Sequence, residues 1–163
     1  MMIIGTHLIN GETLTIEDLD WNMNFFRKLS SFAVLDVDNY MHVHRKGSVS
    51  NATGQKRYKS CLDQITVIDR WYNVYKDYTD SELLKKATLS YLSYQFFITV
   101  GKSKGLDKEY YKDIKKRLKK VDKIAKYSIE KKQKIISLIY RILGFNISVL
   151  LLGFYYGKRS DDI

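Results

Sequence analysis

The sequence predicts an α+β protein that is predominantly α-helical, and three observations support this. Proline is absent from all 163 residues, so the commonest helix breaker is missing. From residue 57 onward, apolar residues recur at helical spacing. Before that point, two short β-like runs (32–36 and 40–45) flank the turn pair Asp38-Asn39. We therefore expect a short β-hairpin-like element after an N-terminal helix, followed by about four longer helices.

The N-terminal helix is expected to begin within residues 15–21. Thr15 can cap it, and the carboxylates of Glu17, Asp18 and Asp20 fall in the first turn, where negative charge favours the helix dipole. The apolar residues that follow at helical spacing are Leu19, Met23, Phe26 and Leu29.

A small, polar stretch at 46–56 predicts a flexible loop, which divides the chain into regions 1–56 and 57–163. The second region should hold the longer helices. One apolar stripe runs from Leu62 to Tyr75, and a broader one runs from Leu83 to Phe97 after a cap at 79–81. The last two helices are expected at 108–127, which is strongly basic, and at about 130–157.

Positive charge is concentrated in one part of the chain. The net charge is +10, and 14 of the 28 Lys and Arg residues lie between Lys102 and Lys134 beside only five acidic residues. Such a face would attract phospholipid headgroups, nucleic acid or a charged polymer, although a solvated helix face is an equally good interpretation. The single cysteine, Cys61, rules out an internal disulfide and is compatible with the cytoplasm. We recognise no signal peptide and no uninterrupted apolar run of about 18 residues.

A carboxylate and a polar, cationic cluster occur in the N-terminal part of the chain. Inverting sugar transfer needs a carboxylate that takes the proton from the acceptor hydroxyl, and cations or donors against the leaving diphosphate. Asp18 could supply the first, and His44, Arg45 and Ser48 the second, if the fold brings them together. Taken on residue type and spacing alone, Asp18 is more often a helix cap and His44-Arg45 more often a surface pair.

The order of these residues resembles a known family. Residues 12–50 contain Gly-Glu, then Glu-Asp-x-Asp-Trp opening a helix, then Tyr-x-x-x-x-Arg-x-Gly-Ser. This order is similar to the acceptor-side segment of family 2 glycosyltransferases, which are inverting enzymes of the GT-A fold. In this chain the second motif spans 40–48.

The resemblance implies a role for each matching residue. Asp18, the Asp of the Glu-Asp pair, would be the general base, with Glu17 and Trp21 on the substrate. His44 and Arg45 would reach the donor diphosphate. Ser48 would lie on a loop that closes over the donor, with Gly47 allowing its tight turn.

One half of such an enzyme is missing from the sequence. Family members hold the nucleotide on an upstream run of β–α units that ends in an Asp-x-Asp motif for Mg²⁺ or Mn²⁺. Here only positions 1–16 precede Glu17. We therefore expect a fragment or subunit that is inactive alone and that binds no cofactor itself. A partner chain would carry the nucleotide half, and a nucleotide-sugar and a glycan acceptor would be its substrates.

Two patterns that suggest a metal site are interpreted otherwise. Asp36-Val37-Asp38 follows the Glu-Asp helix, whereas the family's metal motif precedes it, so we expect a turn. His42 and His44 share one strand face, but two ligands without a third make a poor site. No metal ligand is predicted.

The last helix has three open interpretations. Residues 142–157 carry no charge, and aromatic residues precede Lys158-Arg159 in the manner of an interfacial belt. The helix could be part of the core, lie at a membrane interface, or form a marginal span. An anionic membrane is therefore a candidate partner, and we expect a cytoplasmic protein, peripheral on the inner face of the plasma membrane.

The alternative function is a basic helical module for nucleic-acid binding or structural interaction. Basic residues with interleaved tyrosines could follow phosphates and stack bases. However, Tyr72, Tyr75, Tyr91 and Tyr94 fall on or beside apolar stripes, so most of them should be core. Because no recognised nucleic-acid motif is present, we do not expect nucleic acid as a partner.

Overall fold

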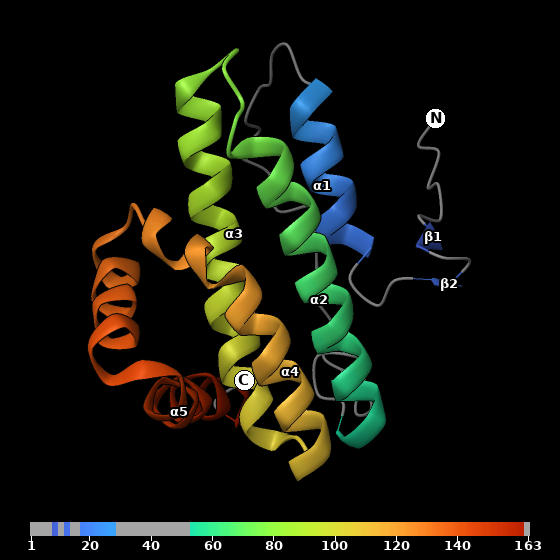
Figure 1. Ribbon diagram of the computed structural model, residues 1–163, viewed down its shortest axis with the longest axis vertical. Helices are drawn as coiled ribbons and strands as arrows, with labels where there is room; N and C mark the ends of the chain where they lie inside the picture. Colours follow the sequence, from blue (N-terminus) through green and yellow to red (C-terminus); the bar gives the residue numbers. More distant parts are fainter. Residues whose placement is uncertain (1–7, 10–11, 14–16, 29–52, 162–163) are drawn as a thin grey trace.

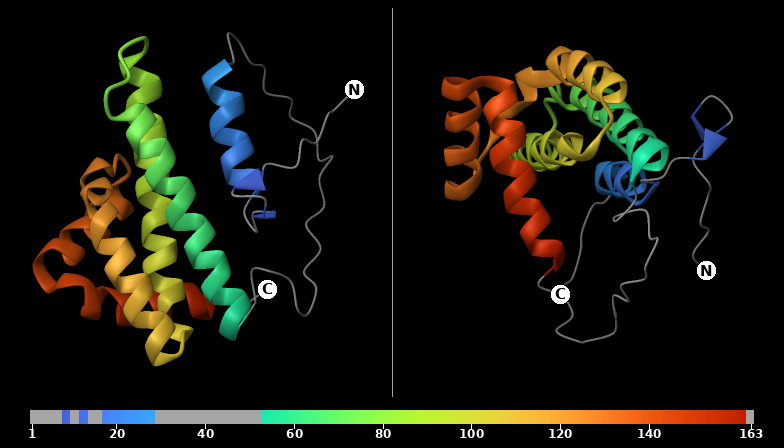
Figure 2. Two further views of the ribbon diagram at one scale, coloured as in Figure 1. Left: turned by 45° about the vertical axis from the view of Figure 1, so that its right-hand side comes forward. Right: turned by 90° about the horizontal axis from the view of Figure 1, so that it is seen from below.

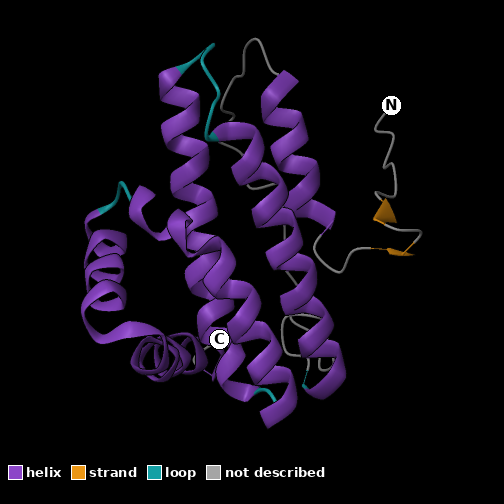
Figure 3. Ribbon diagram, in the orientation of Figure 1, coloured by secondary structure: helices purple, strands orange, loops and turns teal. Residues whose placement is uncertain are grey.

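The computed structural model describes residues 8–9, 12–13, 17–28 and 53–161 (Figure 1). This part of the chain is helical, as Figure 3 shows. Its α-helices are α1 (Glu17–Lys28), α2 (Gly54–Tyr75), α3 (Glu82–Lys102), α4 (Lys108–Val121) and α5 (Lys131–Asp161). Two 3₁₀ segments, η2 (Ser103–Gly105) and η3 (Asp122–Tyr127), follow α3 and α4.

The predominance of helix is confirmed, and the β-structure differs from the prediction. The strands in the described residues are only β1 (Leu8–Ile9) and β2 (Glu12–Thr13), which pair antiparallel with Leu8 opposite Thr13. The β-hairpin predicted at 32–45 is not seen, because it lies outside the described residues, as does the Thr15 cap. The boundary proposed at residue 56 falls just inside α2, which already begins at Gly54.

Helix α3 forms the centre of the bundle. It contacts α2, α5 and η3, while α4 packs on α2 (Figure 1). Its start is fixed by Ser81, whose Oγ accepts a hydrogen bond from the Leu84 amide at 3.2 Å, within the predicted cap. Fully buried side chains of α2, α3 and α4 meet in the core, among them Ile68, Tyr75, Leu92, Phe96, Phe97, Ile114 and Leu118.

The predicted apolar stripes are correct for α2 and α4 and partly wrong for α3. Leu83 is 81 % exposed, whereas Leu84 in the same turn of α3 packs against the core, so Leu83 lies on the uncovered side of the helix. Tyr91, predicted as core, is 38 % exposed, whereas Tyr75 is buried as predicted. The lysines of α4 face solvent, which agrees with a solvated basic face.

Helix α5 is not the single straight helix that the sequence suggested. Gly144 has φ 73° and ψ −179°, a backbone conformation that is essentially restricted to glycine and that separates two helical halves. The half before Gly144 runs along the direction of α3, and the half after it crosses underneath (Figures 1 and 2). The crossing is close: a Cβ on Gly101 of α3 would lie 3.1 Å from the Leu152 carbonyl oxygen.

The break in α5 bears on the three interpretations of the last helix. The stretch Lys131–Tyr156 is long and apolar enough to cross a bilayer by length and composition. Divided at Gly144, however, the two halves of α5 (131–143 and 145–161) are about 20 and 26 Å long at 1.5 Å per residue, each shorter than a hydrocarbon core of about 30 Å. Only 33 % of its most apolar window is buried, so it is not simply a core helix either.

Candidate functional site

Helix α1 presents one carboxylate and two aromatic rings to solvent. Asp18, Trp21 and Phe25 recur at i, i+3 and i+7, so they lie on one side of the helix, which we call the outward face of α1. The two rings stack with centroids 4.9 Å apart and 10° between their planes. Trp21 is 38 % and Phe25 44 % exposed. Together the stacked rings form a partly exposed apolar surface directly beside a solvent-accessible carboxylate.

The opposite side of α1 holds the helix to α2 through Asp20. This carboxylate is only 1 % exposed. Its Oδ1 accepts from Trp71 Nε1 at 2.7 Å, and Arg70 Nη1 donates to both of its oxygens at 3.0 Å. Leu19 and Met23 are buried beside it. Asp20 therefore has a structural role, and Asp18 is the accessible carboxylate of the two.

Two groups of α3 lie within the electrostatic reach of Asp18. Partial burial raises the pKa of Tyr91, a hydrogen bond with Gln95 opposes this, and the Asp18 charge adds to the rise. For Lys102, burial lowers the pKa, while the negative charge of Asp18 is among the influences that raise it. A phenol and an ammonium group on α3 thus both respond to the carboxylate of α1.

The other predicted site residues are not brought together with Asp18 in the described part of the chain. His44, Arg45 and Ser48 lie outside the described residues, as do Asp36, Asp38 and His42. Glu17 opens α1 as predicted, but its side chain is not described. The pairing of Asp18 with a diphosphate-binding cluster therefore stays a prediction.

No metal centre is found among the residues that the structure describes, since no three His, Cys, Asp or Glu side chains there gather closely enough to hold an ion. Cys61 is completely buried, and burial raises the pKa of its thiol to about 11, with Lys102 and Arg57 opposing the rise. A buried thiol that stays protonated is neither an effective nucleophile nor a metal ligand.

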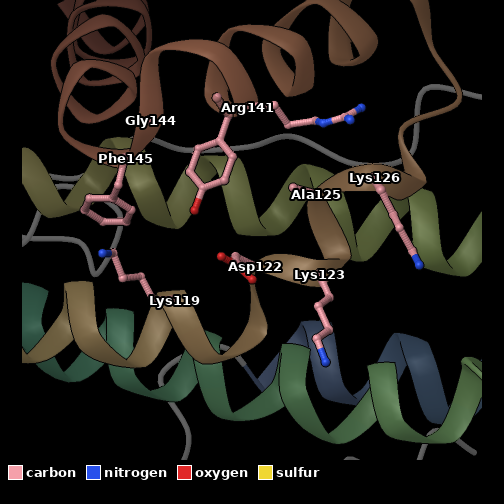
Figure 4. Close-up of a pocket in the computed structure, with 9 residues that line it drawn as sticks. Lys119, Asp122, Lys123, Ala125, Lys126, Arg141, Gly144 and Phe145 are labelled. Carbon is pink, nitrogen blue, oxygen red and sulfur yellow. The ribbon is translucent and has the colours of Figure 1, made fainter.

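A concave surface lies where α5 bends (Figure 4). It encloses about 550 Å³ between η3, the end of α4 and the Gly144 elbow. In the close-up, Lys123 and Lys126 extend in a similar direction, away from Arg141, and the Lys119 ammonium lies toward Phe145. Burial, together with the Asp122 charge, raises the pKa of Tyr140 in its wall to about 12. Because these cationic side chains do not converge on one position, the hollow is not a preformed anion-binding site. It is a cavity with an aromatic wall and basic residues around its edge.

The chain matches no family model, no curated protein and no solved structure. The resemblance to family 2 glycosyltransferases therefore rests on the residues of the 12–50 segment alone.

Three residues of this region were not predicted from the sequence. Phe25 could have been, because it lies four residues after Trp21 and so on the same helix face. Tyr91 and Lys102 could not, because only the packing of α1 beside the α2–α3 pair brings them near Asp18. The role of Asp20 was equally hidden, since its partners follow 50 and 51 residues later.

Proposed function

We propose that this chain provides the acceptor side of an inverting glycosyltransferase active site, with Asp18 as the general base. The observation that carries the proposal is the outward face of α1, where an exposed carboxylate stands beside two stacked aromatic rings. A general base must be reachable by the hydroxyl that it deprotonates. Of the two described carboxylates in the first turn, Asp18 meets this condition and Asp20 does not.

The aromatic pair suits a sugar acceptor. A pyranose ring has an apolar face of C–H groups and a rim of hydroxyls, so it can pack on a flat aromatic ring while its hydroxyls meet polar groups. Trp21 and Phe25 would hold the sugar face, and Asp18, one turn before Trp21, would accept the proton of the attacking hydroxyl. Tyr91 is a further polar group available on α3.

Transfer also needs a donor-binding part that holds the nucleotide-sugar with Mg²⁺ or Mn²⁺. The resemblance assigns His44, Arg45 and Ser48 to the diphosphate, but no nucleotide-binding unit is recognised in the 163 residues. We therefore expect no measurable transfer from UDP-sugars by the 163-residue chain alone. Steady turnover of UDP-glucose or UDP-galactose by this chain would overturn the expected dependence on a donor half.

The acceptor site itself can be tested without the donor half. The fluorescently tagged chain would be applied to an array of surface oligosaccharides and lipid-linked disaccharides. We expect weak binding to a subset of the glycans, and we expect Trp21→Ala to lower the affinity for them at least tenfold. The matched control is Tyr155→Ala, which removes a 51 % exposed ring from α5 and should leave glycan binding unchanged. Equal loss in both variants, or no glycan binding by the wild type, would contradict an acceptor site on α1.

The base assignment needs a separate experiment. In an assembly that is active, Asp18→Asn should reduce kcat by at least a hundredfold and leave glycan binding within about threefold, because the amide keeps the size of the side chain but cannot take the proton. Near-normal turnover by Asp18→Asn would remove Asp18 from this role.

The observations weigh against the nucleic-acid alternative. Tyr58 and Tyr110 stack on each other with centroids 4.3 Å apart, so the Tyr110 ring of α4 packs against α2 and is only partly exposed. The exposed lysines of α4 could contact phosphates, but Tyr111, the other tyrosine of this helix, is also only partly exposed.

A further inference from the structure

An extended apolar surface on α5 has no partner in the described chain. In the half before Gly144, Ile135, Leu138 and Ile142 recur at i, i+3 and i+7 and are more than half exposed. In the half after Gly144 the exposed apolar side chains again share one face: Ile147, Leu150, Leu151, Phe154 and Tyr155. Soluble surfaces rarely leave so many neighbouring apolar side chains uncovered, so this surface is expected to bind something.

The charged residues within the stretch Lys131–Tyr156 all have one sign. From Lys131 to Tyr156 there is no Asp or Glu, while Lys131, Lys132, Lys134 and Arg141 lie on the first half. Lys134 and Arg141 each directly precede an exposed isoleucine, so they flank the apolar stripe.

Two lysines from outside α5 border its second half. The Lys104 Nζ lies 3.1 Å from the centre of the Phe154 ring. The Lys115 Nζ donates to Asn146 Oδ1 at 2.8 Å, one residue before the exposed Ile147. Both halves of α5 thus combine exposed apolar side chains with cations.

We propose that α5 docks this protein on an anionic lipid bilayer, with both helical halves in the interfacial plane. Apolar side chains would enter the boundary between headgroups and acyl chains, and the lysines would meet lipid phosphates. A second copy of this chain would instead bring cationic surfaces together, which disfavours self-association through the same face. The break at Gly144 suits an interfacial arrangement, because neither half reaches across the bilayer.

The docking goes beyond the proposed transferase function and does not depend on it. Vesicle binding itself requires neither a glycan nor Asp18. Asp18→Asn should therefore bind vesicles as the wild type does, so the two proposals can fail separately.

The test is flotation of the full chain with two kinds of vesicle, at low and high salt. One kind is phosphatidylcholine alone, and the other is phosphatidylcholine and phosphatidylglycerol mixed two to one. We expect binding only with phosphatidylglycerol, weakened severalfold by high salt because the headgroup attraction is screened. Leu138→Gln with Leu151→Gln should reduce affinity at least tenfold. Both side chains are about half exposed, so the fold should persist, as circular dichroism would verify.

Two double variants that each remove two positive charges show whether lipid binding depends on the lysines of α5 or only on the net charge of the protein. Lys131→Gln with Lys134→Gln should weaken binding roughly tenfold, since each lysine near an anionic surface contributes substantially. Lys28→Gln with Lys76→Gln removes the same charge from exposed positions at the ends of α1 and α2, and should change binding less than twofold. Equal effects of the two pairs, or no binding to phosphatidylglycerol vesicles, would overturn the proposal. If the wild-type chain forms a dimer but binds no lipid, and Leu138→Gln with Leu151→Gln disrupts that dimer, the apolar surface of α5 would instead be the contact with a second copy.

Discussion

Helices α1 and α5 both turn apolar side chains outward, but they do so beside opposite charges. On α1 the exposed rings of Trp21 and Phe25 stand beside the carboxylate of Asp18. On α5 the exposed aliphatic side chains stand among lysines and an arginine, with no acidic residue from Lys131 to Tyr156. Exposed apolar side chains therefore lead to different expected ligands, a neutral sugar acceptor for α1 and an anionic bilayer for α5.

The two helices are also attached to the bundle in different ways. A single buried carboxylate, Asp20, and two apolar side chains fasten the short α1 to α2. Phe145, Val149 and Leu152 fasten α5 to α3 over a longer surface. A helix that depends on one polar cluster should be far more sensitive to a single substitution than one held by distributed apolar contacts.

The largest effect is expected for Asp20→Ala. It leaves the Trp71 Nε1 donor and the Arg70 guanidinium without their acceptor, and should lower the free energy of unfolding by about 2–3 kcal/mol, less than for a fully buried pair because Arg70 is partly exposed. Urea unfolding followed by tryptophan fluorescence measures this loss. Asp20→Asn, which retains an acceptor, should cost about half as much. A loss below about 0.5 kcal/mol for the alanine variant, within the range of ordinary surface substitutions, would show that α1 is held in another way.

Gly144→Ala tests the elbow of α5. Its backbone lies in a region that side chains avoid, so the variant should lose about 1–2 kcal/mol in thermal or urea unfolding. The cost comes from the backbone alone, because a Cβ there would meet nothing within 4 Å. Leu143→Ala, at an exposed neighbouring position, is the control and should change stability by less than about 0.5 kcal/mol. A Gly144→Ala variant as stable as the wild type would mean that α5 tolerates a straight form.

A polar link at the surface should matter less than the buried one at Asp20. The Tyr58 hydroxyl donates to Asp113 Oδ2 at 2.8 Å in a partly exposed position, so Tyr58→Phe should cost about 0.5–1 kcal/mol. The same urea experiment measures this loss.

The same link predicts a pH dependence. Burial alone would raise the pKa of Asp113, but hydrogen bonds from Arg117 and Tyr58 outweigh it and hold the pKa below its ordinary value. The carboxylate therefore adds stability above about pH 4, the usual pKa of Asp, and loses it as the pH falls through the lower folded pKa. The stability difference between wild type and Tyr58→Phe should shrink in acid. A difference that grows below about pH 4 would contradict this sign.

The smallest effect on stability is expected for Asp18→Asn. Its side chain is exposed and its only described hydrogen bond is from the adjacent Leu19 amide at 2.9 Å, so the change should stay within about 0.5 kcal/mol in the same urea experiment. Two carboxylates separated by one residue would then differ severalfold in their contribution to stability. If Asp18→Asn destabilised the protein as much as Asp20→Asn, Asp18 would be a structural residue and a poor choice of base.

Sequence patterns predicted the helices well because helix formation depends on spacing within a short segment. The start of α1 near Glu17, the cap at Ser81 and the buried stripe of α4 were all visible in local sequence. The exposure of Leu83 and Tyr91 was not, since it depends on which sides of α3 the other helices cover. The elbow of α5 was missed because a glycine within an apolar helical pattern is usually tolerated, and its positive φ comes from the packing of the two halves.

By itself, the sequence determined that this protein is a basic, mainly helical chain whose first turn carries three carboxylates beside a tryptophan. Only the tertiary structure decided which carboxylate is available, since the burial of Asp20 depends on Arg70 and Trp71 from another helix. It also decided that the apolar helix α5 is broken at Gly144 and that many of its apolar side chains are exposed. Periodicity fixes which residues share a face of a helix, whereas burial depends on what packs against that face.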